Sequence, residues 1–191
     1  CDNSASGANH PSDPTLGTVP RMETTAAMQA DAQLQFSTLL EQHRGIVLKV
    51  AHSYAWNPDD RAELAQEIAA QAWRAFSGYD PGRRFSTWLY RIALNVSISF
   101  ARGDGLRRGH AVPLDEDAHE LADAAASDPA RALQVRALQA FIAALPPLDR
   151  ALLLLYLEDR GYREIADILG ISQTNVSTRI SRLKQRIRNE L

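Results

Sequence analysis

Apolar residues recur at helical spacing along most of this 191-residue chain, and sustained alternation of apolar and polar residues is nearly absent. The pattern predicts three helices over residues 32–102. The first ends near Trp56, and the third begins near Ser86. The second follows Asn57-Pro58, because asparagine is a good N-cap and proline fits the first helical position. We therefore expect a small helical domain in this part of the chain.

A second helical domain is predicted over residues 128–191. Asp128-Pro129 provides another cap followed by proline, and it opens a helix that Pro146-Pro147 interrupts. A further helix is predicted from Leu148 to Glu158, and the last unit begins at Gly161. The predicted fold class is therefore all-α, with two small helical domains.

The segment after Gly161 has the spacing of a helix-turn-helix. Ile165, Ala166 and Leu169 would form the inner face of a short helix, which ends at Gly170 in the left-handed conformation that glycine adopts at low cost. Ser172 is placed to cap a second helix. Its apolar stripe is Val176, Ile180, Leu183 and Ile187, spaced four, three and four residues apart.

The opposite face of that second helix carries side chains that read base edges. Arginine pairs with guanine, and asparagine or glutamine pairs with adenine, in the major groove that such a helix enters. Other polar residues on the helix suit phosphate contacts, which position a protein on DNA without specifying sequence. The predicted DNA-binding residues are Ser172, Gln173, Thr174, Asn175, Thr178, Arg179, Arg182, Lys184 and Arg186. An amphipathic helix with a solvated basic face is the alternative.

Charge is segregated along the chain, although the net charge is only −2. Residues 160–191 hold seven Arg or Lys and three acidic residues, as expected of a segment that contacts phosphates. Residues 103–130 hold two arginines and seven acidic residues. We expect residues 103–127 to form a flexible acidic linker between the two domains.

Residues 1–31 are rich in small and polar residues without periodicity, and they are predicted to be disordered. Met22 or Met28 is a candidate start, which leaves open whether residues 1–21 belong to the native protein. A leading Cys1 before a polar tail also resembles a mature lipoprotein. No stretch approaches the ~18 apolar residues that a membrane span needs, so no membrane insertion is expected.

Two blocks of sequence resemble the extracytoplasmic-function (ECF) sigma factors of bacterial RNA polymerase. Gly161-Tyr-x-Glu-Ile-Ala-x-Ile-Leu-Gly-Ile-Ser172, preceded by Leu145-Pro-Pro-Leu-Asp-Arg150, is similar to the last conserved region of that family. Asp60-Arg-Ala-Glu-Leu-Ala-Gln-Glu67 resembles its core-polymerase-binding helix. Tyr79-Asp-Pro-Gly82 and Phe85-Ser-Thr-Trp-Leu-Tyr-Arg91 resemble its promoter-melting segment.

The resemblance implies a cytoplasmic factor that directs promoter-specific transcription initiation. Residues 32–102 would correspond to sigma region 2, and residues 128–191 to sigma region 4. The implied partners are core RNA polymerase, through the clamp helices of its largest subunit and the flap of the second-largest, promoter DNA, and an anti-sigma factor. The residues implied in polymerase binding are Asp60, Glu63, Leu64, Gln66 and Glu67. For Asp60 and Leu64, helix-dipole complement and core packing are the alternatives.

The resemblance also implies that the segment from Tyr79 to Asn95 melts the minus-ten element, while the helix-turn-helix reads the minus-thirty-five element. Aromatic side chains would stack on an unpaired base, and arginines would hold the strand. The implied residues are Tyr79, Arg83, Arg84, Phe85, Thr87, Trp88, Arg91 and Asn95. For Phe85 and Trp88, a place in the core is the alternative.

Two departures from the family pattern stand out. Glu63 replaces the more usual aspartate. Ser177-Thr-Arg179 stands where many members have Lys-Ser-Arg, which leaves the preferred minus-thirty-five sequence open.

Other classes of function have less support from these residues. The five histidines, at positions 10, 43, 52, 110 and 119, show no metal-ligand spacing, and glycine-rich phosphate loops and nucleophile elbows are absent. We therefore expect no catalytic residues, no metal site, no cofactor and no enzyme activity. A stand-alone helix-turn-helix regulator is the main rival, and a lipid-anchored or purely protein-binding helical module is the third class. The regulator would not need the aromatic and basic residues at 79–95.

Overall fold

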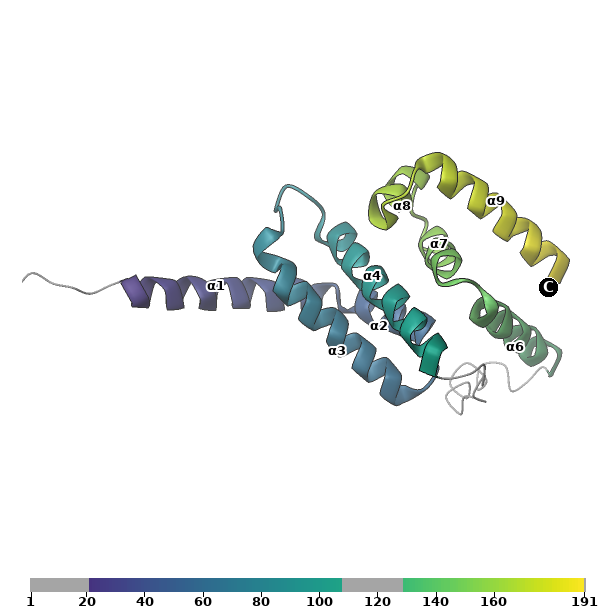
Figure 1. Cartoon of the computed structure of the whole chain (residues 1–191), viewed down its shortest axis with the longest axis horizontal. Coiled ribbons are helices and arrows are strands. Elements are labelled where there is room, and N and C mark those ends of the chain that lie inside the picture. Colours follow the sequence, from purple (N-terminus) through teal and green to yellow (C-terminus); the bar gives the residue numbers. More distant parts are fainter. Residues whose placement is uncertain (1–20, 108–128, 191) are drawn as a thin grey trace, which may run out of the picture. The chain divides into compact units, whose positions relative to one another are not determined.

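The computed structural model describes residues 21–107 and 129–190, which form helices and no strand (Figure 1). The all-α prediction is confirmed for these residues. The helices are α1 (Arg21–Gln42), α2 (Arg44–Tyr54), α3 (Pro58–Ala75), the 3-10 turn η1 (Phe76–Gly78), α4 (Phe85–Arg107), α6 (Pro129–Ala144), α7 (Pro147–Leu157), α8 (Tyr162–Leu169) and α9 (Gln173–Glu190).

The chain divides into two compact units, residues 1–35 and residues 36–191. Helix α1 begins at Arg21, so the prediction of disorder is wrong for residues 21–31, while residues 1–20 lie outside the described part. Helix α4 continues to Arg107, five residues into the predicted linker, and the rest of that linker, residues 108–127, lies outside the described residues. Apart from residues 32–35, the two predicted domains both fall in the second unit.

A break at His43 divides the single helix that was predicted to end near Trp56. His43 has φ −116° and ψ 14°, outside the helical range, and its ring Nδ1 donates a hydrogen bond of 2.9 Å to the carbonyl oxygen of Leu39. The backbone N–H of His43 donates to the carbonyls of Leu39 and Leu40. The carbonyls of Leu39 and Leu40 in the last turn of α1 thus have donors, and α2 starts afresh at Arg44.

Helix α3 begins as the sequence predicts. The Asn57 side chain accepts a hydrogen bond of 2.7 Å from the backbone N–H of Asp60, and Pro58 takes the first helical position. Leu64, Ile68 and Ala72 follow at intervals of four residues, and all three are completely buried. This stripe packs α3 against α2 and α4, forming the N-terminal block (α2, α3 and α4).

Helices α7, α8 and α9 form the C-terminal block, in which each helix contacts the other two. Ile165 and Ile168 on α8 are buried, as are Val176, Ile180 and Leu183 on α9. Leu169, predicted to face inward, is only partly buried, because Ile168 takes the innermost position. The α8–turn–α9 unit has the predicted helix-turn-helix form.

Gly170 ends α8 with φ +67°, the left-handed conformation that the sequence predicts. A methyl group at Gly170 would meet no atom within 4 Å, so only the backbone conformation penalises a larger residue. Gly45 also has open space, but it lies inside α2 with an ordinary helical conformation. Because neither site is crowded, a difference between alanine substitutions at the two glycines reports the backbone conformation rather than steric contact.

We expect Gly170→Ala to lower the free energy of unfolding by ~1–2 kcal/mol, since a left-handed alanine is strained. The same change at Gly45 is expected to raise it by ~0.5–1 kcal/mol, because alanine is favoured over glycine in a helix. Urea denaturation measures the free energy of unfolding of both variants. Equal effects at the two sites would contradict this account of Gly170.

The two blocks touch along α2 and α4 on one side and α7 and α8 on the other, which we call the inter-block contact. Tyr54 donates a hydrogen bond of 2.6 Å to the carbonyl of Pro147, and Thr87 donates one of 3.0 Å to Glu164. Glu158 pairs with Lys49 and accepts a bond of 3.4 Å from the hydroxyl of Tyr90. The inter-block contact therefore includes hydrogen bonds and an ion pair between defined side chains, in addition to apolar packing.

Arg150 on α7 is the buried cation of the inter-block contact, with 7% of its surface exposed. Its guanidinium donates to the carbonyls of Ser53 at 3.1 Å, Ala143 at 2.7 Å and Leu145 at 3.4 Å. It also lies over the Tyr54 ring, 5.2 Å from the ring centre. Burial lowers the pKa of Arg150 and raises the pKa of Tyr54.

Tyr90 is the second buried hydroxyl of the inter-block contact. Its ring lies beneath the guanidinium of Arg160, 5.2 Å from the ring centre, and its hydroxyl faces Glu158. Burial and the negative charge of Glu158 raise the pKa of Tyr90 to about 12. The phenol therefore remains protonated and acts as a hydrogen-bond donor across the contact.

Candidate nucleic-acid interface

Helix α9 has the two faces that the sequence predicts. Val176, Ile180 and Leu183 are buried against α7 and α8. The predicted base-reading residues on the other side are exposed, with the exception of Arg179: Gln173, Thr174, Asn175, Thr178 and Arg182. A continuous polar face of this kind is what a recognition helix presents to the major groove.

Local hydrogen bonds at the start of α9 engage two of the predicted DNA-binding residues. The hydroxyl oxygen of Ser172 accepts a bond of 3.2 Å from the backbone N–H of Asn175, which confirms Ser172 as the N-cap. The hydroxyl of Thr178 donates to the carbonyl of Thr174 at 2.9 Å. Thr178 therefore presents its methyl group and oxygen lone pairs, rather than a donor, to the outside.

Arg179 differs from the other residues of this face because its side chain is only 37% exposed. Its Nε donates to Oδ1 of Asn175 at 2.9 Å, and its Nη1 donates to Oδ1 of Asp149 at 2.8 Å. Asp149 lies in the first turn of α7, and its side chain is 19% exposed. The guanidinium is thus held between two helices of the C-terminal block.

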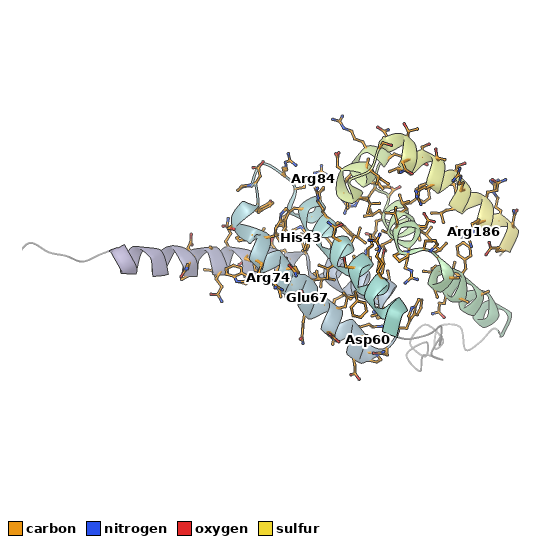
Figure 2. All side chains as sticks on the ribbon, in the orientation of Figure 1. His43, Asp60, Glu67, Arg74, Arg84 and Arg186 are labelled. Atoms are coloured by element: carbon orange, nitrogen blue, oxygen red, sulfur yellow. The ribbon has the colours of Figure 1, made fainter. Side chains whose placement is uncertain are left out.

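Two of the cations farther along α9, Lys184 and Arg186, lie over aromatic rings. The ammonium of Lys184 is 4.4 Å from the centre of the Tyr156 ring, and its hydrogen bond to the Tyr156 hydroxyl raises the pKa of Lys184. Arg186, labelled in Figure 2, lies 5.4 Å from the centre of the Phe141 ring and pairs with Glu190 at 3.1 Å. Both remain on the surface, where a phosphate could compete for them.

Aromatic side chains of the N-terminal block gather around the loop between η1 and α4. The ring centres of Phe76, Tyr79, Phe85 and Trp88 lie 5.1–6.2 Å from one another in the pairs that touch. Phe85 is only 5% exposed, whereas Tyr79 and Trp88 are partly exposed. Phe85 therefore lies in the core, the alternative that the sequence left open, and cannot stack on a base in this conformation.

The loop itself is built by short-range bonds. Asp80 accepts a bond of 2.9 Å from the backbone N–H of Gly82, and the Tyr79 hydroxyl donates to the carbonyl of Arg83 at 2.7 Å. The predicted basic and polar residues around it are exposed: Arg83, Arg84, Arg91 and Asn95. Arg83 lies 3.7 Å from the carboxylate of Asp80, and Arg84 lies at the start of α4 (Figure 2).

Thr87, also predicted to contact the minus-ten element, is instead engaged within the protein. Its hydroxyl donates to Glu164 of α8, which also accepts a bond of 2.9 Å from Arg160. The predicted melting helix and the helix-turn-helix therefore meet at this point. No group of three or more metal-ligating side chains occurs within the described ranges.

The predicted polymerase-binding residues of α3 divide into exposed and buried sets. Glu63, Gln66 and Glu67 are exposed. Leu64 has no exposed surface, so the structure supports its alternative role in the core and excludes a direct polymerase contact in this conformation. Asp60 is 8% exposed and completes the helix cap beside Asn57, which fits the local role considered for it.

Glu67 organises the exposed face of α3. It accepts bonds from Gln71 at 2.8 Å and from Arg74 at 3.2 Å, and Figure 2 labels Glu67 and Arg74 on this helix. Trp73 lies on the same helix with 42% of its surface exposed, and its ring is stacked on that of Phe76 and tilted against that of Phe36. An exposed tryptophan is typical of a protein-binding surface, because aromatic residues are enriched at interfaces.

Two residues of these surfaces escaped the sequence analysis. Trp73 was not among the predicted polymerase-binding residues, although its position one residue after Ala72 places it outside the apolar stripe of α3. In the sequence, Asp149 is recognisable only as an acidic residue in the first turn of a helix. Its contact with Arg179 joins residues 30 positions apart, which no local pattern indicates.

The described residues define the class of a helix-turn-helix protein with a second, aromatic-rich helical body. The chain belongs to the sigma-70 family: residues 39–107 match Sigma-70 region 2, and residues 135–187 match Sigma-70, region 4. The matches confirm the resemblance to the ECF group, because its members are among the similar proteins. No described helix is both long and apolar enough to cross a membrane.

Three relatives illustrate the match. ECF RNA polymerase sigma factor SigE of Mycolicibacterium smegmatis is 32% identical over 84% of this chain and 63% of its own length. The probable RNA polymerase sigma factor RfaY of Xanthomonas campestris is 31% identical, over 85% of this chain and 42% of RfaY. The RNA polymerase sigma-H factor of Pseudomonas aeruginosa is 30% identical over 76% of this chain and 79% of its own. The chain thus spans less than two thirds of the first two relatives.

Two solved structures share the fold. CnrH, in complex with the cytosolic domain of CnrY, matches 84% of this chain and 92% of CnrH with a TM-score of 0.60 and 22% identity. The sigma factor RpoE of Bartonella quintana, in complex with the anti-sigma factor NepR, matches 83% of this chain and 95% of RpoE with a TM-score of 0.54 and 16% identity.

Proposed function

We propose that this chain binds core RNA polymerase and directs it to specific promoters. In this proposal α9 reads the minus-thirty-five element, and the N-terminal block melts the minus-ten element. The observation that carries the proposal is the presence of both surfaces on one chain: an exposed polar recognition helix, and an aromatic and basic loop at residues 79–84. The protein would act through binding alone, in the cytoplasm, where polymerase and promoter meet.

The proposed minus-thirty-five contact rests on the exposed face of α9. Gln173, Asn175 and Arg182 offer the donors and acceptors that discriminate bases in the major groove. Ser172 serves this contact indirectly, because it fixes the first turn of α9. Lys184 and Arg186, held over aromatic rings at the far end, are placed for phosphate contacts.

The proposed minus-ten contact rests on Tyr79 and Trp88, whose partly exposed rings offer a stacking surface next to the exposed guanidinium groups of Arg83, Arg84 and Arg91. A base that leaves the duplex loses its stacking partners, and an aromatic surface returns ~1–3 kcal/mol per base. The buried Phe85 ring supports this surface, since it packs against the rings of both Tyr79 and Trp88.

The proposed polymerase contact rests on the exposed side of α3, with Glu63, Gln66, Glu67 and Trp73. The acidic residues would pair with basic side chains on the clamp helices, and Trp73, near the C-terminal end of α3, would supply apolar contact area. An anti-sigma partner stays a prediction for this chain, although each of the two solved relatives is in complex with another protein.

A run-off transcription assay with purified core polymerase and genomic promoter fragments tests the proposal. We expect the full chain to enter a holoenzyme during gel filtration and to direct transcripts from defined start sites. A stand-alone regulator would instead bind operator DNA without polymerase. Tight sequence-specific binding of DNA by the chain alone, with no entry into a holoenzyme, would sink the proposal.

The exposed Arg182 provides a residue-level prediction for this interface. We expect Arg182→Ala to reduce discrimination at one base pair of the minus-thirty-five element by ~1–3 kcal/mol, because a bidentate contact to one base would be lost. Transcription from promoters varied one base pair at a time measures the effect. An equal loss on every promoter would reassign Arg182 to phosphate contact.

A further inference from the structure

The Arg179 guanidinium is held by an intramolecular network before any DNA is bound. Two of its five N–H groups are engaged, one by Asn175 at 2.9 Å and one by Asp149 at 2.8 Å. The Asp149 carboxylate is 19% exposed, and it lies on a different helix from Arg179. A charge-assisted bond with little exposure restrains a side chain more than a fully solvated pair does.

The network also sets the orientation of the Asn175 amide. An arginine only donates hydrogen bonds, so the atom of Asn175 that faces Arg179 must be its oxygen. The amide nitrogen of Asn175 then points away from Arg179, on an exposed residue of α9. Without Arg179 in this place, the amide could rotate and present either its oxygen or its nitrogen to a base.

We propose that Asp149 is a positioning residue for base reading by α9. It holds Arg179 in one orientation, and through Arg179 it holds the Asn175 amide with its nitrogen outward. The Asp149–Arg179–Asn175 network thus presents hydrogen-bond donors to the groove: three N–H groups of Arg179 and the amide nitrogen of Asn175. Base edges that offer acceptors are favoured, and edges that offer a donor at this position are disfavoured.

This inference rests on the proposed function, because it concerns the base pairs that α9 reads. The competing explanation is local: an acid in the first turn of α7 also complements the positive end of that helix, whose N-cap residue Pro146 makes no side-chain cap. A helix-dipole role would alter stability without altering base preference. The two explanations therefore differ in a measurable quantity.

The test uses holoenzyme assembled from the full chain and core polymerase, with a promoter library in which each base pair of the minus-thirty-five element is varied in turn. We expect Asp149→Ala to flatten the preference at the base pair read by this network by roughly tenfold, with the other positions unchanged. Asp149→Asn, which retains an acceptor oxygen, is expected to keep most of that preference. Adding Asp149→Ala to Arg179→Ala should change the profile no further.

Asp167→Ala is the matched control, since it removes the same charge from an exposed position of α8 and should leave the profile unaltered. A uniform rise in transcription on all promoters, with stronger dependence on salt, would show that Asp149 only neutralises Arg179. An unchanged profile would likewise overturn the inference. If the unaltered chain directs no transcription, the proposed function fails instead, so the two failures are distinguishable.

Discussion

Replacing Phe85 by alanine is expected to lower the free energy of unfolding by ~3–5 kcal/mol, the largest effect of any single change considered in the N-terminal block. Phe85 is 5% exposed, and its ring centre lies 5.1 Å from those of His43 and Trp88 and 5.4 Å from that of Tyr79. Truncation removes all three aromatic contacts and leaves a cavity that the surrounding helices fill only in part.

Thermal and urea denaturation of the full chain measure this effect. Arg84→Ala is the matched control, because Arg84 is adjacent in sequence but exposed, and its stability should change by no more than ~0.5 kcal/mol. Promoter melting, followed with permanganate or a fluorescent base, should respond in both variants. A Phe85→Ala protein of normal stability that fails only in melting would return Phe85 to the list of residues that touch DNA.

Arg150→Ala is expected to cost ~3 kcal/mol, because the carbonyls of Ser53 and Ala143 each lose a charge-assisted donor in a buried place. Arg150 joins three chain segments, since Ser53 belongs to α2 and Ala143 to α6. Its contacts with the rings of Tyr54 and Trp56 are lost as well.

Arg150→Lys separates charge from geometry. Lysine keeps the positive charge, but one ammonium cannot reproduce the planar fork that reaches carbonyls on both sides, so less than half of the loss should be recovered. The exposed Arg163 of α8 serves as the control, and Arg163→Ala should change stability by ~0.5 kcal/mol or less. A stable Arg150→Ala protein would contradict the role assigned to the buried guanidinium.

The helix-turn-helix was predictable because its signals are local. The cap at Ser172, the left-handed Gly170 and the apolar spacing from Val176 to Leu183 all act within one or two helical turns. The same holds for Asn57 and Pro58 at the start of α3. Each of these features follows from the backbone chemistry of a few adjacent residues, without knowledge of the tertiary structure.

The features that were missed depend on contacts between distant residues. No local pattern indicates that Asp149 meets Arg179, or that Arg150 reaches Ser53, which lies 97 positions away. The break at His43 is accompanied by a side-chain bond to Leu39, which the helical spacing of the apolar residues around it does not indicate. The start of α1 at Arg21 was missed because its first turns lack an apolar stripe.

The resemblance indicated which segments matter, but burial decides which side chains in them can reach a partner. Leu64 belonged to the predicted polymerase-binding set, yet it follows the spacing of Ile68 and Ala72 and is buried with them. Phe85 and Trp88 were both left open between core and DNA, and only the structure separates the buried ring from the partly exposed one.

The bond between Thr87 and Glu164 has a geometric consequence for promoter binding. Two elements about 25 base pairs apart, at ~3.4 Å each, are separated by roughly 85 Å along the duplex. Helices that touch through a 3.0 Å hydrogen bond cannot occupy both ends of that length at once. Under the proposed function, engagement of both elements therefore requires the two blocks to part, and the apparent affinity for a promoter would be the intrinsic affinity multiplied by the fraction of molecules in which the blocks are already separated.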